Sequence, residues 1–144
     1  MDRVARVNSD AYFLGRVTRV ALFGSMLNPS IDSPSDIDLA VEIVPRIADW
    51  ESHTERNNER VQELMTLGQR FRHTIEYAAC WQLEVFRFLK GRSRAISLAD
   101  YKIEKRLVLS VAHRMLLGAD EPPPHRDDKA PVKRLRRRSR DCPF

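Results

Sequence analysis

The sequence has only two cysteines and no long apolar run, and each shortage excludes a class of protein. Cys80 and Cys142 form neither a disulfide framework nor a zinc-binding spacing, and none of the four histidines pairs with them. No apolar stretch approaches the ~18 residues that a membrane helix needs. The first residues, Met-Asp-Arg-Val-Ala-Arg-Val, contain no apolar stretch of signal-peptide length. These absences predict a cytoplasmic protein with no membrane association.

The composition is that of a globular protein of ordinary size. At 144 residues, with 42% hydrophobic and 31% charged side chains, the chain is long enough to bury a core as one domain. The net charge of +5 is uneven, because eight Lys/Arg and five Asp/Glu follow Gly118. We predict a folded domain over residues 1–118 and a disordered, proline-rich and basic tail over residues 119–144.

Two strands flank a loop near the N-terminal end. The run Val17–Phe23 is continuously apolar toward its end, which predicts a strand buried on both faces. Residues 26–35 carry Asn-Pro, Ser-Pro and further serines, which predict a loop. The next strand, 36–43, alternates: its isoleucines, leucine and valine point one way, while Asp36, Asp38, Ala40 and Glu42 point the other.

Helical patterns dominate the remainder. We predict a helix starting at Asp49 or Ser52 and stopping at Gly68, with a thin buried stripe of Val61, Leu64, Met65 and Leu67. A second helix is predicted from Thr74 to Lys90, a short strand over 94–99 and a final helix over 101–117. A short helix over 11–14, capped by Asn8, Ser9 or Asp10, is a further expectation.

The stretch between the two strands carries the chemistry. Gly24 permits backbone conformations closed to other residues and lets a phosphate approach the main chain, while Ser25 adds a hydroxyl donor. Asp36 and Asp38 are two residues apart on a strand, so their backbones are ~6.6 Å apart on one face. Such a pair suits Mg²⁺, which prefers oxygen ligands and takes phosphate and water for its remaining positions. The alternative interpretation is that these residues only form a turn and hold no nucleotide or metal.

This stretch resembles the nucleotidyltransferase superfamily related to DNA polymerase β, whose signature is Gly-Ser, a loop and Asp-x-Asp. The ten-residue loop is similar to that of the minimal nucleotidyltransferases that accompany HEPN-domain toxins in toxin–antitoxin pairs. The resemblance implies an α+β fold, a small mixed β-sheet with helices packed on one side. It also implies that Gly24 and Ser25 contact the triphosphate of ATP, that Asp36 and Asp38 bind Mg²⁺, and that Ser35 belongs to the same motif.

The implied reaction is transfer of a nucleoside monophosphate, usually AMP, to a hydroxyl group. A tyrosine of a HEPN-domain toxin is the acceptor that the resemblance favours, since the chain shows no second domain to hold an acceptor. The family usually adds a third carboxylate from a later strand, and the matching position here is Ser97. Asp100 lies three residues on, either as that carboxylate or, as we favour, as the N-cap of the last predicted helix.

Two alternatives to an adenylyltransferase remain open. The serine at position 97 favours a nucleotide-binding or antitoxin module of the same fold with little or no turnover. A transferase acting on RNA or a small molecule is the other, and it depends on the basic tail. The Arg136-Arg137-Arg138 cluster would contact nucleic acid, but apart from Phe144 no aromatic residue interleaves it, and a solvated tail is the default interpretation.

Overall fold

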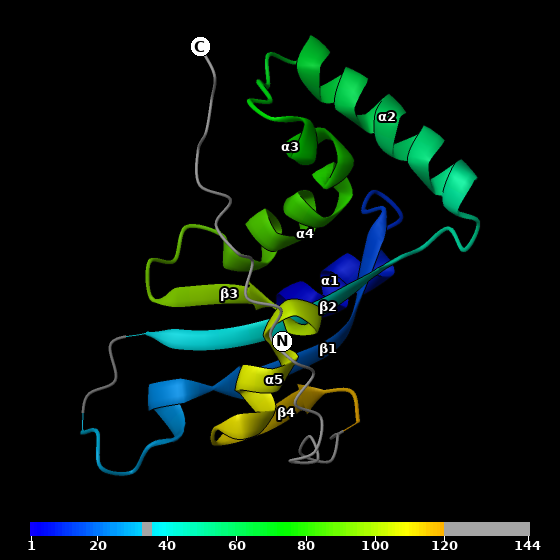
Figure 1. Ribbon diagram of the computed structural model, residues 1–144. Coiled ribbons are helices and arrows are strands. Elements are labelled where there is room, and N and C mark those ends of the chain that lie inside the picture. Colours follow the sequence, from blue (N-terminus) through cyan, green and yellow to red (C-terminus); the bar gives the residue numbers. More distant parts are fainter. Residues whose placement is uncertain (33–35, 120–144) are drawn as a thin grey trace, which may run out of the picture.

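A computed structural model describes residues 1–32 and 36–119 of the chain. Ser35 and residues 120–144 of the predicted tail therefore lie outside the described residues. No helix in the described ranges is both long enough and apolar enough to span a membrane. The elements are, in chain order, α1 (Asp2–Ser9), β1 (Gly15–Phe23), the 3₁₀ helix η1 (Gly24–Leu27), β2 (Ile37–Pro45), α2 (Trp50–Thr66), α3 (Thr74–Ala78), α4 (Cys80–Lys90), β3 (Ile96–Asp100), α5 (Tyr101–Ser110) and β4 (His113–Leu117) (Figure 1).

The strands form a mixed sheet in the order β3-β2-β1-β4. β1 is antiparallel to both β2 and β4, whereas β2 and β3 are parallel. The parallel pair requires a long crossover, which α2, α3 and α4 provide. The predicted α+β class, the two strands around residue 30 and the strand near residue 97 are confirmed.

Helices cover both faces of the sheet, because β2 alternates as its sequence predicts. Leu39, Val41 and Ile43 join the larger core with α1 and α4, in which Val7, Val85 and Trp81 are buried. Ala40 faces the other way and packs with Ala21, Tyr101 and Val108, which ties α5 to the opposite face. The prediction that the helices pack on one side is therefore wrong for α5.

The N-terminal helix lies earlier than the predicted helix over 11–14. α1 ends at Ser9, and the side chain of Asn8 accepts from the Val17 backbone N–H at 2.7 Å and donates to the Val17 carbonyl at 2.9 Å. Asp10 accepts from the Tyr12 N–H at 2.9 Å in the turn that follows. The polar residues expected to start a helix instead anchor the end of one to β1.

The predicted helix over 101–117 is wrong beyond Ser110. α5 stops there, and residues 113–117 form β4 along the edge of β1. Ile103 and Leu107, expected on a buried helix face, are 77% and 50% exposed. Backbone pairing with the open edge of β1 outweighs the local helical spacing, which a sequence pattern cannot register.

The helices between β2 and β3 start where predicted, but the break at Ala79 and the buried residues of α2 differ from the prediction. Asp49 caps α2, its carboxylate accepting from the Ser52 N–H at 2.9 Å, and α4 ends at Gly91 as expected. The predicted helix over 74–90 is broken at Ala79 into α3 and α4. The predicted apolar stripe of α2 is wrong at Met65 and Leu67, which are exposed; its buried face is largely polar and consists of His53, Asn57, Arg60 and Val61.

Candidate functional site

Gly24 and Asp38 meet where β1 ends and β2 begins. The backbone of Gly24 has a φ of 83°, in the left-handed region that favours glycine. A Cβ atom at this position would lie 2.8 Å from the Asp38 Oδ2 atom. A larger side chain here would be strained by the positive φ and would require the Asp38 carboxylate to shift. Gly24 and the Asp38 carboxylate are therefore close neighbours at the adjoining ends of β1 and β2.

Asp38 occupies the middle of a row that crosses all four strands. The register pairs Phe23 with Asp38 and with His113, and it pairs Asp38 with Ser97. Paired residues point to the same face of a sheet, so these four side chains share the face that α5 partly covers. Ser97 thus occupies the β3 position directly beside Asp38, where the family resemblance expects a carboxylate.

The two acidic side chains on this face of β2 differ in their partners. The Glu42 carboxylate lies 3.4 Å from Arg19 Nε and 3.9 Å from Lys102 Nζ. Within residues 1–32 and 36–119, no salt bridge or hydrogen bond engages the side chain of Asp38 or Asp36. A half-buried carboxylate with no cation nearby is a favourable ligand for an added metal ion.

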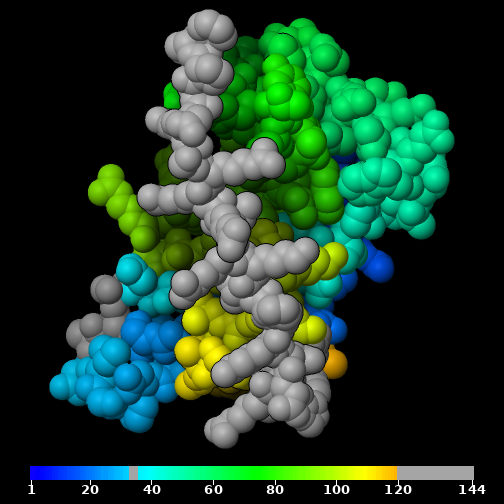
Figure 2. All heavy atoms as spheres, viewed as in Figure 1, coloured from blue at the N-terminus to red at the C-terminus, as the bar shows by residue number. Residues whose placement is uncertain are grey.

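A hollow of about 440 Å³ opens beside the glycine. Its lining comes from η1, the loop after it and the segment before β4: Gly24, Ser25, Leu27, Asn28, Pro29, Ile31, Val111 and Ala112. In the space-filling view the residues around 24–32 form the lower left corner, with the residues of α2 and α3 at the opposite end (Figure 2). The hollow offers backbone groups and the Ser25 hydroxyl next to Gly24.

The other predicted acidic residues of the site, Asp36 and Asp100, lie just before β2 and at the end of β3. Asp36 is exposed and lies one residue before β2, so its sharing of a face with Asp38 stays a prediction. Asp100 is the N-cap of α5, its carboxylate accepting from the Lys102 N–H at 2.8 Å, as favoured from the sequence. It is paired with Val41, three positions along β2 from Asp38.

The donor set that remains is small. The part of the chain that the structure describes brings together no group of three or more His, Cys, Asp or Glu side chains that could hold a metal ion. Two carboxylates suit Mg²⁺ nevertheless, because this ion commonly completes its octahedron with phosphate oxygens and water. Asp36 and Asp38 would supply two of the oxygen ligands of such an ion.

Sequence reasoning missed the contribution of the β4 end to this site. Val111 and Ala112 line the hollow, and His113 follows them opposite Phe23. The Val111 carbonyl lies 3.0 Å from His113 Nδ1 and can only accept, so Nδ1 carries the proton in this contact. These residues were assigned to a helix, and their sequence contains no alternation strong enough to indicate a strand.

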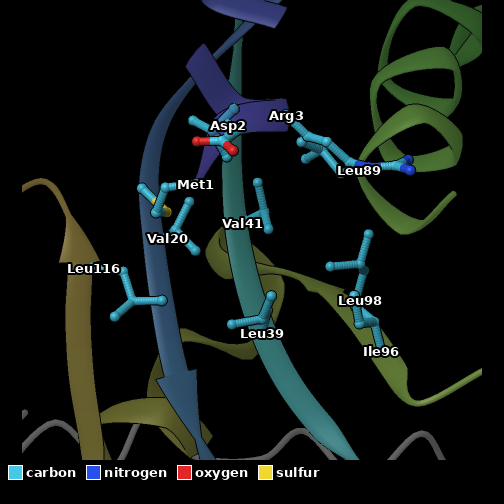
Figure 3. Close-up of a pocket in the computed structure, with 11 residues that line it drawn as sticks. Met1, Asp2, Arg3, Val20, Leu39, Val41, Leu89, Ile96, Leu98 and Leu116 are labelled. Atoms are coloured by element: carbon cyan, nitrogen blue, oxygen red, sulfur yellow. The ribbon is translucent and has the colours of Figure 1, made fainter. Parts of the chain in front are cut away.

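A second hollow, of about 410 Å³, lies on the other face of the sheet (Figure 3). Val20, Leu39, Val41 and Leu98 form its floor, and α1 and Leu89 of α4 border it. These strand residues point away from Asp38, because successive side chains alternate between faces. This apolar hollow is therefore separate from the Gly24–Asp38 site.

Comparison with protein-family models, curated proteins and solved structures found no match to this chain. A functional assignment consequently rests on the geometry around Gly24 and Asp38 and on the motif resemblance.

Proposed function

We propose that the chain binds a nucleoside triphosphate with Mg²⁺ at Gly24, Ser25, Asp36 and Asp38, and that it acts as a nucleotidyltransferase. The observation that carries the proposal is the meeting of Gly24 and Asp38. A glycine in the left-handed region follows one strand, and the Asp38 carboxylate of the next strand, which has no ion-pair partner among residues 1–32 and 36–119, lies against it. Turn chemistry alone would not require a carboxylate at this position.

Each residue of the site has a distinct proposed role. Gly24 lets the phosphate chain approach the backbone, and Ser25 donates a hydrogen bond from its hydroxyl. Asp36 and Asp38 would hold Mg²⁺, which when bound neutralises phosphate charge and favours the ionised form of an attacking hydroxyl. The hydroxyl oxygen forms a bond to the α-phosphorus while the bond from the α-phosphorus to the α,β-bridging oxygen breaks. Pyrophosphate leaves with that electron pair, and the hydroxyl proton passes to water. We propose ATP as the donor and a partner protein, such as a HEPN-domain toxin, as the acceptor.

A binding module of the same fold is the second candidate, and the placement of Ser97 favours it. A serine stands beside Asp38 where a third carboxylate would complete the site. Without it, removal of the proton from the acceptor hydroxyl has no assigned base, so turnover would be slow or absent. The chain would then act as an antitoxin or nucleotide sensor by contact. The transferase acting on RNA or a small molecule depends on the tail and has no support among the described residues.

Calorimetry with ATP and Mg²⁺ tests the site directly. We expect Asp38→Asn to weaken binding by about tenfold or more, since charge-assisted contacts typically contribute ~1.5–3 kcal/mol. Glu42→Gln is the matched control, because Glu42 lies on the same strand and face but is already paired with Arg19. Absence of ATP binding by the natural chain, or equal losses in the two variants, would reject the nucleotide site.

Label transfer then separates the enzyme from the module. ATP labelled at the α-phosphate is incubated with Mg²⁺, the protein and the product of a neighbouring gene. Label on the acceptor together with pyrophosphate release, both lost in Asp38→Asn, supports the transferase. Binding without either product supports the module.

A further inference from the structure

The layer of helices that crosses from β2 to β3 contains a pocket unrelated to the Gly24–Asp38 site. It measures about 330 Å³ and lies between α2, α3 and α4. Trp50, Tyr77 and Trp81 contribute aromatic side chains to its lining, and His53 contributes an imidazole. α2 follows the end of β2 that is remote from Asp38, and Figure 1 shows these helices at the other end of the molecule from η1.

His53 is buried without a hydrogen-bond partner. Its side chain is 1% exposed, and neither Nδ1 nor Nε2 has a partner among the described residues. Its neighbour Asn57 is fully engaged, donating to the Tyr77 carbonyl at 2.9 Å and accepting from the Trp81 N–H at 3.0 Å. Buried polar groups in proteins are normally paired, so the two ring nitrogens of His53 lack the hydrogen bonds expected at such a position.

The acceptor nitrogen of the His53 ring needs a hydrogen-bond donor. Burial lowers the pKa of His53 below its ordinary value, so the ring is neutral at pH 7 and has one N–H and one acceptor nitrogen. The ring of Trp81 lies edge-to-face with it, with centroids 4.8 Å apart. A π face can receive an N–H but cannot donate, so the acceptor nitrogen still lacks a partner.

Trp50 adds an exposed aromatic surface beside this group. Its side chain is 65% exposed, and its ring lies 5.4 Å from that of His53 at an angle of 35°. The N-cap at Asp49 fixes the first turn of α2 and with it the position of Trp50. An exposed indole beside a buried imidazole is a typical lining for a pocket that binds a flat ligand.

We propose that this pocket binds a neutral, planar, nitrogen-containing aromatic ring, which donates a hydrogen bond to His53 and contacts the ring of Trp50. The volume is at the lower limit of small-molecule sites, ~300–1,000 Å³, and suits one or two fused rings. The proposal is independent of nucleotide binding at Gly24 and Asp38.

The two tryptophans of the chain, Trp50 and Trp81, both line the pocket, so their indole N–H resonances report on it without labelling. We propose titrating the full chain with benzimidazole, which has an N–H donor, and with 1-methylbenzimidazole, which has none. Benzimidazole should shift both resonances saturably. The methylated compound should bind about tenfold more weakly, the effect of losing one hydrogen bond to a buried group.

Variants test the role of His53. His53→Phe keeps an aromatic ring but removes both nitrogens, and it should abolish the preference for benzimidazole. His113→Gln, on β4, is the control and should retain it. If His53→Phe does not fold, Trp50→Ala replaces a mostly exposed side chain and should weaken binding severalfold at the Trp81 resonance. No saturable shift, or equal binding of both compounds to the natural chain, would overturn the proposal.

Discussion

The helical layer and the Gly24–Asp38 end of the sheet differ in how their acidic side chains are paired with cations. In the helical layer the buried guanidinium of Arg60 donates to the Tyr12 carbonyl at 2.7 Å and pairs with Glu63 at 3.1 Å and Glu84 at 3.7 Å. At the sheet end the carboxylate of Asp38 has no such partner within the described residues. A carboxylate that is paired with a cation of the protein contributes to the fold, whereas one without such a partner is available to an added cation.

Removing the charge of Arg60 should produce the largest loss of stability. Arg60→Met leaves the Glu84 carboxylate, 11% exposed, without its cation. Breaking one partner of a buried ion pair typically costs ~3–5 kcal/mol in the free energy of unfolding. Arg56→Met is the control on the same helix, since Arg56 is 37% exposed and pairs only with surface glutamates. Chemical denaturation should show a loss of ~0–1 kcal/mol for it, and equal losses would remove the distinction between engaged and surface pairs.

A methyl group at Gly24 should damage the site as well as the fold. Gly24→Ala forces an alanine into positive φ and toward Asp38, and we expect a loss of ~2 kcal/mol together with weaker ATP binding. Gly68→Ala has a similar φ of 93° but meets nothing within 4 Å of the added Cβ. It should cost ~1 kcal/mol and leave nucleotide affinity unchanged. Denaturation and calorimetry on both variants separate backbone strain from contact with Asp38.

The pH dependence of stability should reveal the buried imidazole. Burial lowers the pKa of His53 below its ordinary 6.5, so the unfolded chain binds a proton that the folded chain resists. The contribution of His53 to stability is therefore full above about pH 6.5 and is lost as the pH falls through that value toward the folded pKa. The rings that contact it, Trp50 and Trp81, carry no charge, and burial is the cause of its lowered pKa.

Denaturation between pH 7.5 and pH 5 measures this effect. The stability of His53→Phe should fall less steeply than that of the natural chain. His73→Gln changes an exposed histidine and should keep the natural slope. Identical slopes for the natural chain and His53→Phe would contradict a buried, neutral imidazole.

A carboxylate at position 97 should change the free energy of unfolding least among these substitutions. It should change the proposed AMP transfer most directly. Ser97→Asp places a second carboxylate beside Asp38 across the parallel pair. Like charges side by side cost ~0.2–1 kcal/mol, and Mg²⁺ should reverse this loss. If the missing carboxylate limits turnover, AMP transfer should rise in the variant. Destabilisation that Mg²⁺ does not relieve would argue against a metal between the two strands.

The sequence predicted the parts of the fold whose local pattern agrees with their tertiary setting. The alternation of β2 fixed which side Asp38 faces, and the register confirms that Ser97 lies beside it. Asp49 and Gly91 marked helix ends correctly because capping is a local property.

The failures occur where a distant partner decides the structure. β4 forms because β1 has an open edge, and the polar face of α2 is buried because Tyr12, Tyr77 and Trp81 supply partners far away in the sequence. The unpaired nitrogens of His53 and the lining by Val111 and Ala112 depend on the same long-range packing. None of these has a signature in local spacing.

The crossover between β2 and β3 also bears on how the molecule assembles. Asp38 and Ser97 are neighbours in the sheet, although the whole of α2, α3 and α4 separates them along the chain. Contacts between residues so distant in sequence close a long loop, which slows their formation relative to the β1–β2 hairpin. We expect the hairpin that joins Gly24 to Asp38 to form early and the β3 side of the site to dock last. Partly folded chains would then carry the glycine–aspartate pair before Ser97 reaches its place beside it.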